Sequence, residues 1–185
     1  VGYDIWHQIA PAYGADLVRG DIAAVSGLPA DRLEHWWGGE FLVGPSDRFA
    51  QLSEVIERLY PIYLQISSRL HHQGDEMLLT AALHVLEQTG SPIIDDGGTA
   101  GAVGRWWSAR TLSPIEPLTA FADRSLLHLP ADKDLLSEIW DRSDLTGSLL
   151  YDHLIHRLRY KTLSRRIAGL IHPLLPGPRR YAPRL

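Results

Sequence analysis

The sequence predicts an α/β domain, and three observations support that prediction. An apolar run with a glycine pair, residues 36–44, has the composition of a buried strand. Two patterns of helical periodicity follow it, over residues 46–70 and from residue 75. After residue 90, short β-like segments and a further helix alternate. Strands and helices that alternate in this way are typical of α/β domains.

Composition sets the broad class of the protein. The chain has 185 residues, 45% hydrophobic and 22% charged, which suits one globular domain with an appended element. It contains no cysteine, which excludes disulfides and thiolate metal sites. No apolar run approaches the roughly 20 residues of a membrane-spanning helix. We expect a cytoplasmic protein whose upstream part is missing, because the chain starts at Val1 rather than at methionine.

The first 44 residues contain one clear element. Residues 1–35 mix Gly, Pro and Asp with short apolar pieces, and we expect loops around one short strand or helix there. In the following run, W-W-G-G-E-F-L-V-G, aromatic and β-branched residues flank the pair Gly38-Gly39. A glycine pair inside a buried strand indicates that another group approaches the backbone closely.

A helix is predicted from Pro45-Ser46-Asp47 to about residue 70. Its apolar residues recur at alternating spacings of three and four, which is typical of one stripe on a helix that packs against a core. The stripe consists of Phe49, Leu52, Ile56, Leu59, Tyr63, Ile66 and Leu70.

Asp75 and Glu76 open the next predicted helix, and we expect Gly90 to end it in a left-handed conformation. Asp75 is well placed as the N-cap, where its carboxylate would accept backbone N–H groups at the positive end of the helix dipole. Capping alone would explain the acidic pair. The alternative is that these carboxylates lie at the mouth of a cleft and act as base, nucleophile or electrostatic stabiliser.

His71 and His72 precede the acidic pair and raise the question of a metal site, for instance in a metal-dependent hydrolase that uses both histidines and Asp75. Adjacent histidines on a helix point about 100° apart and rarely bind one ion. The sequence therefore favours other roles for these two imidazoles.

Four residues in the second half of the chain are further candidates. His128 is either a half-buried loop histidine or a ligand of a divalent cation, and Lys133, at the start of a helix over about 131–140, would then meet a phosphate. Trp106 and Trp107 either stack on a sugar or pack in the core. Spacing alone leaves both questions open.

The C-terminal region differs in charge from the rest of the chain. No acidic residue follows His153, whereas eight of the 18 Lys and Arg residues do, which leaves ten basic and 22 acidic residues before it. A helix over 152–175 would be amphipathic. It either docks on the acidic body or contacts an anionic membrane surface as a peripheral helix at the inner face. The acidity of the body argues against nucleic acid as a partner.

The order of the motifs resembles the later half of a GT-A fold glycosyltransferase, of the retaining blood-group-type and glycogenin-like kind. The motifs are G-G-E-F-L-V-G, a long helix, G-D-E-M-L-L-T-A-A-L and H-L-P-A-D-K, within residues 36–135. The resemblance implies that residues 1–145 are the later half of a GT-A-like domain, with the nucleotide-binding half upstream. Residues 146–185 would be a basic helical extension.

The resemblance also implies roles for residues of the first two motifs. Gly38, Gly39 and Glu40 would form a wall that faces the sugar. Asp75 and Glu76 would lie beside the anomeric carbon of the donor sugar, where positive charge develops during transfer.

For the later residues, the resemblance implies contacts with the leaving group. His128 would complete the shell of a Mn²⁺ or Mg²⁺ ion, and Lys133 would contact the leaving diphosphate. Trp106 and Trp107 would stack on a sugar face.

We therefore expect a metal-dependent enzyme that transfers a sugar from a nucleotide-sugar donor to a glycan or lipid-linked acceptor, such as one of a bacterial envelope. The alternative is a non-catalytic α/β module that binds a membrane or another partner through its basic tail.

Overall fold

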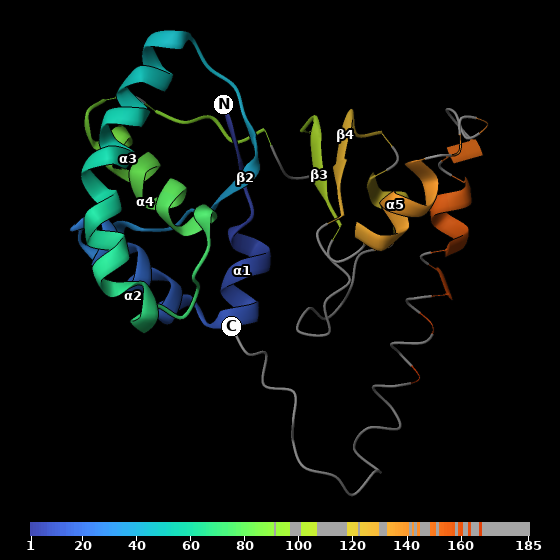
Figure 1. Ribbon diagram of the computed structural model, residues 1–185, viewed down its shortest axis with the longest axis horizontal. Helices are drawn as coiled ribbons and strands as arrows, with labels where there is room; N and C mark the ends of the chain where they lie inside the picture. The colour runs from blue at the N-terminus through green and yellow to red at the C-terminus, as the bar shows by residue number, and fades with distance from the viewer. Residues whose placement is uncertain are drawn as a thin grey trace, which may run out of the picture. The chain divides into compact units, whose positions relative to one another are not determined.

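The computed structural model of the chain (Figure 1) has two compact units, Val1–Gly104 and Arg105–Arg184, and each is described by itself. The structure describes residues 1–90, 92–96, 101–106, 118–121, 123–129, 133–140, 142, 144, 149–150, 152–157, 159–160, 163 and 167. A mixed α and β fold is confirmed, in which helices predominate and the sheets are small. The finer GT-A assignment stays a prediction, as does the division of the chain at residue 145.

The first 32 residues are mostly helical. They form strand β1 (Gly2–Asp4), helices α1 (Trp6–Tyr13) and α2 (Ala15–Ser26), and the 3₁₀ turn η1 (Ala30–Arg32). Gly14 (φ 93°) separates the two helices and Gly27 (φ 74°) ends the second, in a backbone region that favours glycine. The expectation of loops was wrong, because the buried side chains of α2 recur at helical spacing: Val18, Ile22 and Val25.

A small sheet borders the helices of this unit. Strand β2 (Trp37–Leu42) runs antiparallel to β1, which confirms the strand predicted within 36–44. At the other edge of β1, the Gly2 amide donates to the Ile94 carbonyl at 2.9 Å, and the Asp96 amide donates to the Gly2 carbonyl at 2.8 Å. The β-like segment predicted at 92–94 therefore pairs with β1 through its last residue and those that follow.

Two long helices complete the unit and confirm the two helical patterns. They are α3 (Ser46–Ile66) and α4 (Asp75–Gln88), joined by the 3₁₀ turn η2 (Ser67–Arg69) and a short loop. Gly90 has the left-handed backbone (φ 82°) predicted for the residue that ends α4. The stripe of α3 is confirmed in part: Leu52 and Leu59 are buried together with Val55, whereas Phe49 is 41% exposed.

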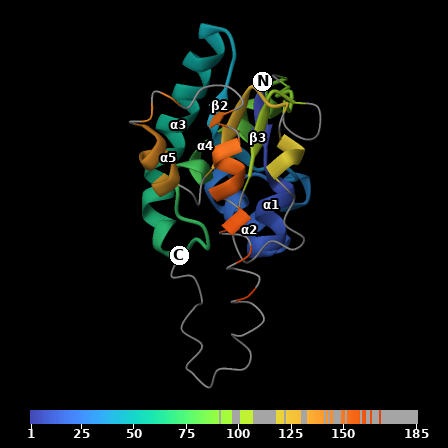
Figure 2. The same cartoon turned by 90° about the vertical axis from the view of Figure 1, so that its right-hand side faces the viewer.

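Helix α4 is the central element of the N-terminal unit. It contacts α2, α3 and β2, and it lies beside α3 in both views (Figures 1 and 2). The fully buried Thr80 joins it to β2, since its Oγ1 donates to the carbonyl of Trp37 and accepts the amide of Trp37, both at 3.1 Å. The second turn of α4 is thereby held next to the strand.

The C-terminal unit has its own small core. Its elements are the 3₁₀ turn η3 (Leu118–Phe121), β4 (Leu126–His128) and α5 (Lys133–Trp140). Strand β3 (Val103–Arg105) ends at the first residue of the unit. Helix α5 confirms the helix predicted near 131–140. Trp106, Leu129 and Leu154 form the core cluster.

The basic C-terminal region is described only in part. The described positions between 149 and 167 are helical, and Leu154 packs in the core cluster of its unit while Arg157 and Arg159 are exposed. The rest of the predicted helix over 152–175 lies outside the described residues. Among the described residues, no helix is both long and apolar enough to cross a membrane.

Candidate functional site

Asp75 and Glu76 occupy the first turn of α4, but Asp75 is not its N-cap. The N-cap is Gly74 (φ −137°, ψ 167°), which has no side chain with which to cap. Asp75 is the first helical residue, and its Oδ1 accepts the amide of Glu76 at 3.1 Å. The prediction of an Asp75 cap was therefore wrong, although both carboxylates lie at the positive end of the helix dipole.

Glu76 lies against strand β2. Its Oε2 accepts a hydrogen bond from the indole Nε1 of Trp36 at 3.3 Å, and a Cβ added at Gly39 would lie 3.4 Å from its Cγ. Trp36 is fully buried and Glu76 is half-buried. The Glu76 side chain thus lies directly beside Gly39, and Trp36 fixes one oxygen of the carboxylate.

Two predicted site residues from separate motifs, Gly39 and Glu76, are therefore neighbours in space. The flanking residues Gly38 and Glu40 belong to the same strand, and Gly38 is buried. The three residues expected to face a sugar belong to β2, and this role stays a prediction.

An aromatic group adjoins the carboxylate. The His72 ring packs edge-on against Trp36 and against Tyr13, with ring centroids 4.8 and 5.4 Å apart. We call this group the Glu76 site, and it consists of Tyr13, Trp36, Gly39, His72 and Glu76. Neither Tyr13 nor Trp36 was among the predicted site residues, although Trp36 begins the run 36–44 from which the strand was predicted.

The neighbouring His71 is held by a buried carboxylate of α2. Asp21, with 8% of its side chain exposed, accepts the backbone amides of His71 and His72 at 2.7 and 3.1 Å. Its other oxygen lies 3.0 Å from the Nδ1 of His71. The described residues contain no group of three or more metal-ligating side chains, so the hydrolase alternative with His71, His72 and Asp75 lacks a donor set there.

A second histidine–carboxylate pair joins β1 to the segment before β2. His35 Nδ1 lies 2.7 Å from Asp4 Oδ2, and the ring stacks on Trp37 and on His84. The hydrogen bond to Asp4 raises the pKa of His35 above 6.5, against the opposing effect of burial. The Asp4, Glu87 and Asp95 carboxylates add attraction in the same direction. This pair links β1 to the segment before β2, and it contains none of the predicted site residues.

The remaining predicted residues belong to the C-terminal unit or lie outside the described residues. Trp106 is 3% exposed and packs in the core cluster, which is the packing alternative left open by the sequence. The carbonyl of half-buried His128 accepts the Trp106 amide at 3.0 Å. Lys133 begins α5. Trp107 lies outside the described residues.

A site for Mn²⁺ or Mg²⁺ requires several oxygen or imidazole ligands that converge. His128 is one such group, but the described part of the chain supplies no cluster of three or more carboxylates and imidazoles. The described residues therefore contain no complete site for the expected ion, dependence on Mn²⁺ or Mg²⁺ stays a prediction, and the steps proposed below are assigned only to side chains of the chain.

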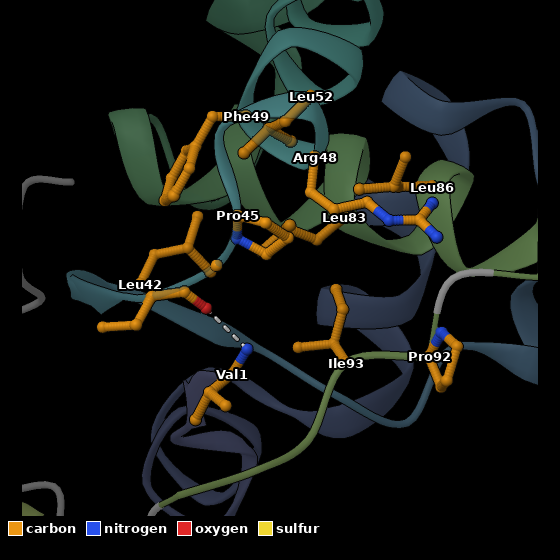
Figure 3. Close-up of a pocket in the computed structure, with 12 residues that line it drawn as sticks. Val1, Leu42, Pro45, Arg48, Phe49, Leu52, Leu83, Leu86, Pro92 and Ile93 are labelled. Atoms are coloured by element: carbon orange, nitrogen blue, oxygen red, sulfur yellow. Dashed lines mark hydrogen bonds between the residues drawn. The ribbon is translucent and has the colours of Figure 1, made fainter.

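An apolar pocket of about 220 Å³ lies at the other end of α4 (Figure 3). Apolar side chains line it from β2, α3, α4 and the segment after α4, and Arg48 extends across it. Its α4 residues, Leu83 and Leu86, follow Glu76 by seven and ten positions, about 10 to 15 Å along the helix axis. The pocket is therefore distinct from the Glu76 site, and the exposure of Phe49 is explained because its ring is part of the pocket wall.

Comparisons of the chain with models of protein families, with curated proteins and with solved structures find no match.

Proposed function

We propose that the protein is a glycosyltransferase and that the Glu76 site binds the sugar of a nucleotide-sugar donor. The observation that supports this proposal most strongly is the contact of Glu76 with Gly39 and Trp36. It joins the two motifs on which the resemblance to GT-A glycosyltransferases rests. Those motifs are far apart in the sequence, so a capping role for the acidic pair does not explain why they meet.

The chemistry requires a fixed negative charge beside the sugar. Positive charge develops on the anomeric carbon as the bond to the nucleotide breaks, and a preorganised carboxylate stabilises it. Glu76 meets this requirement, because it is half-buried and its Oε2 is held by a fully buried indole. Asp75, exposed in the same turn, adds a second negative charge.

The remaining assignments follow from the same resemblance to GT-A glycosyltransferases. Gly38, Gly39 and Glu40 of β2 form the wall beside the sugar, and the acceptor is a glycan or a lipid-linked sugar. The half-buried His72 ring, held edge-on by Trp36 and Tyr13, adds an apolar surface of the kind on which sugar rings pack.

The test is an assay of glycosyl transfer. The protein, expressed together with any sequence that its gene places before Val1, is incubated with UDP- and GDP-hexoses, simple sugar acceptors and Mn²⁺, and the release of UDP or GDP is measured. We expect Glu76→Gln to lower the rate by about 10²- to 10³-fold, the usual effect of losing one electrostatic group. The fold should be kept, because the amide oxygen of glutamine can still accept from Trp36.

Glu57→Gln, an exposed glutamate of α3, is the matched control and should turn over at the wild-type rate. Normal turnover by Glu76→Gln, or no release of nucleotide by the wild-type protein with any donor, would contradict the proposal.

A further inference from the structure

The apolar pocket toward the C-terminal end of α4 is a second candidate site, separate from the Glu76 site (Figure 3). Its walls belong to the N-terminal unit, where β2, α3, α4 and the segment after α4 each contribute apolar side chains. Leu52, Leu83 and Leu86 are the buried part of the lining, and each is 6% exposed or less. Since these leucines lie on two helices that pack against each other, the pocket is preformed.

Other large apolar residues of the lining are exposed to solvent. Val43 is 53% exposed and Phe49 is 41% exposed. The backbone beside them is already paired, because the Val43 amide donates to the Val1 carbonyl at 2.9 Å and the Val43 carbonyl accepts from the Val1 nitrogen at 2.8 Å. Exposed apolar side chains around an apolar hollow are typical of a surface that a ligand covers. The lining therefore favours an apolar ligand group.

Arg48 adds a positive charge to this apolar lining. Among the described residues that line the pocket, it is the one with a charged side chain. The Arg48 side chain extends across the pocket (Figure 3), and its Nη1 donates to Gln51 Oε1 at 2.9 Å. A guanidinium group attracts an anion and matches the planar geometry of a carboxylate. The pocket thus combines an apolar cavity with a cation that suits a carboxylate.

The volume of the pocket sets the size of the ligand. An apolar cavity of about 150 Å³ stays dry and binds benzene. The pocket here measures about 220 Å³. By proportion to the benzene cavity, it holds an alkyl chain of roughly nine carbons.

We propose that the pocket binds a medium-chain fatty acid, with the alkyl chain against Leu52, Leu83 and Leu86 and the carboxylate on Arg48. One guanidinium balances the single charge of a carboxylate, whereas an alkyl phosphate carries roughly two negative charges. The pocket and the Glu76 site lie at different ends of α4, so this binding does not depend on the proposed function.

Calorimetric titration with straight-chain carboxylates tests the class of ligand. The protein, expressed together with any sequence that its gene places before Val1, is titrated with hexanoate, octanoate, decanoate and dodecanoate below their micellar concentrations. Each CH₂ group that enters the pocket should tighten binding by about fourfold. The gain should stop beyond decanoate, whose alkyl chain fills the pocket. Affinity that keeps rising to dodecanoate, or no saturable binding of any acid, would overturn the proposal.

Methyl NMR of the unchanged protein locates the bound acid. The Leu83 and Leu86 methyl resonances should shift saturably with octanoate, whereas those of Leu17, an exposed leucine of α2, should stay in place. Unchanged Leu83 and Leu86 resonances at saturation would place the acid elsewhere and refute the assignment. Shifts of the same resonances when the protein is concentrated without ligand would show that a second copy covers the pocket, which would also refute it.

Arg48→Met tests the role of the charge, because methionine keeps an apolar side chain and removes the guanidinium. Octanoate should bind about tenfold more weakly, the effect of losing a hydrogen bond to a charged group. The uncharged octanol should bind equally well to the variant and the wild type. Arg58→Met, at an exposed arginine of the same helix, is the control and should leave octanoate binding unchanged. Equal wild-type affinity for octanoate and octanol, or tighter binding of octyl phosphate, would contradict a carboxylate on Arg48.

Gly44→Phe tests the location by filling the pocket. Gly44 is part of the lining, and a Cβ added to it would make an ordinary contact with Phe49 Cε2 at 3.8 Å. The added ring should take up space of the alkyl chain and lower the octanoate affinity by about tenfold or more. Gly20→Phe is the control, because a Cβ added there meets nothing within 4 Å. Wild-type octanoate affinity in Gly44→Phe would overturn the proposal.

Discussion

The indole Nε1 of Trp36 donates a hydrogen bond to Glu76 Oε2 across 3.3 Å and joins two residues 40 positions apart. The donor belongs to a fully buried side chain before β2, and the acceptor to the first turn of α4. A carboxylate held in this way keeps one orientation, because its partner cannot move without disturbing the core.

Trp36→Phe should reveal the energy of this bond. Phenylalanine removes the indole N–H and part of the buried volume, and we expect a loss of roughly 2–3 kcal/mol in the free energy of unfolding. In a double-mutant cycle with Glu76→Ala, measured by urea denaturation, the coupling energy should be about 1 kcal/mol. Strictly additive losses would show that the two side chains do not interact.

Gly39 should tolerate only a small side chain. The Cβ of Gly39→Ala would make an ordinary contact with Glu76 Cγ at 3.4 Å, so stability and Glu76 should be little changed. Gly39→Val places further methyl groups on the same carbon and should displace the Glu76 side chain. The readout is the Trp36 indole resonance, which should move in the valine variant and stay in the alanine variant; equal spectra would argue against the contact.

The hydroxyl group of Thr80 should contribute more to the free energy of unfolding than its methyl group does. Thr80→Val leaves the buried amide and carbonyl of Trp37 without the hydroxyl and should cost about 2–3 kcal/mol of unfolding free energy. Thr80→Ser keeps both hydrogen bonds and should cost about 1 kcal/mol for the lost methyl group. Thermal or chemical denaturation orders the two variants, and a valine variant as stable as the serine variant would disprove the account.

The His35–Asp4 pair should make stability depend on pH. The pKa of His35 is raised in the folded state, so its contribution is complete below about 6.5 and disappears as the pH rises through the raised pKa. The difference in unfolding free energy between wild type and His35→Gln should therefore be larger at pH 5.5 than at pH 8.5. His7→Gln is the matched control for loss of a histidine. A difference that grows toward high pH would have the wrong sign.

Strong local periodicity explains which elements were predictable. The strand within 36–44 and the helices after it have clear apolar patterns, and the structure contains them as β2, α3 and α4. Helix α2 was missed although Val18, Ile22 and Val25 recur at helical spacing, because Gly20 and Asp21 lie within it and both residue types are poor helix formers. Asp21 is buried because its hydrogen-bonding partners lie 50 residues further along the chain, and no local signal reveals them.

The candidate site was predictable only in its separate parts. Gly39 and Glu76 were marked by their motifs, but the contact between them depends on how α4 docks on β2. The choice of Trp36 as the partner of Glu76 also depends on that docking, as does the position of His72 between Tyr13 and Trp36. For Trp106, the sequence left stacking and packing open, and burial at 3% exposure shows packing.

The most direct measurement uses the Trp36 indole as a reporter of the Glu76 site. The ¹H–¹⁵N resonance of this indole, assigned with Trp36→Phe, is followed during titration with UDP- and GDP-hexoses in the presence of Mn²⁺. We predict a saturable shift with one donor, which is lost in Glu76→Gln and kept in Glu57→Gln. A Trp36 resonance that stays unchanged with every donor would contradict a sugar-binding role for Glu76.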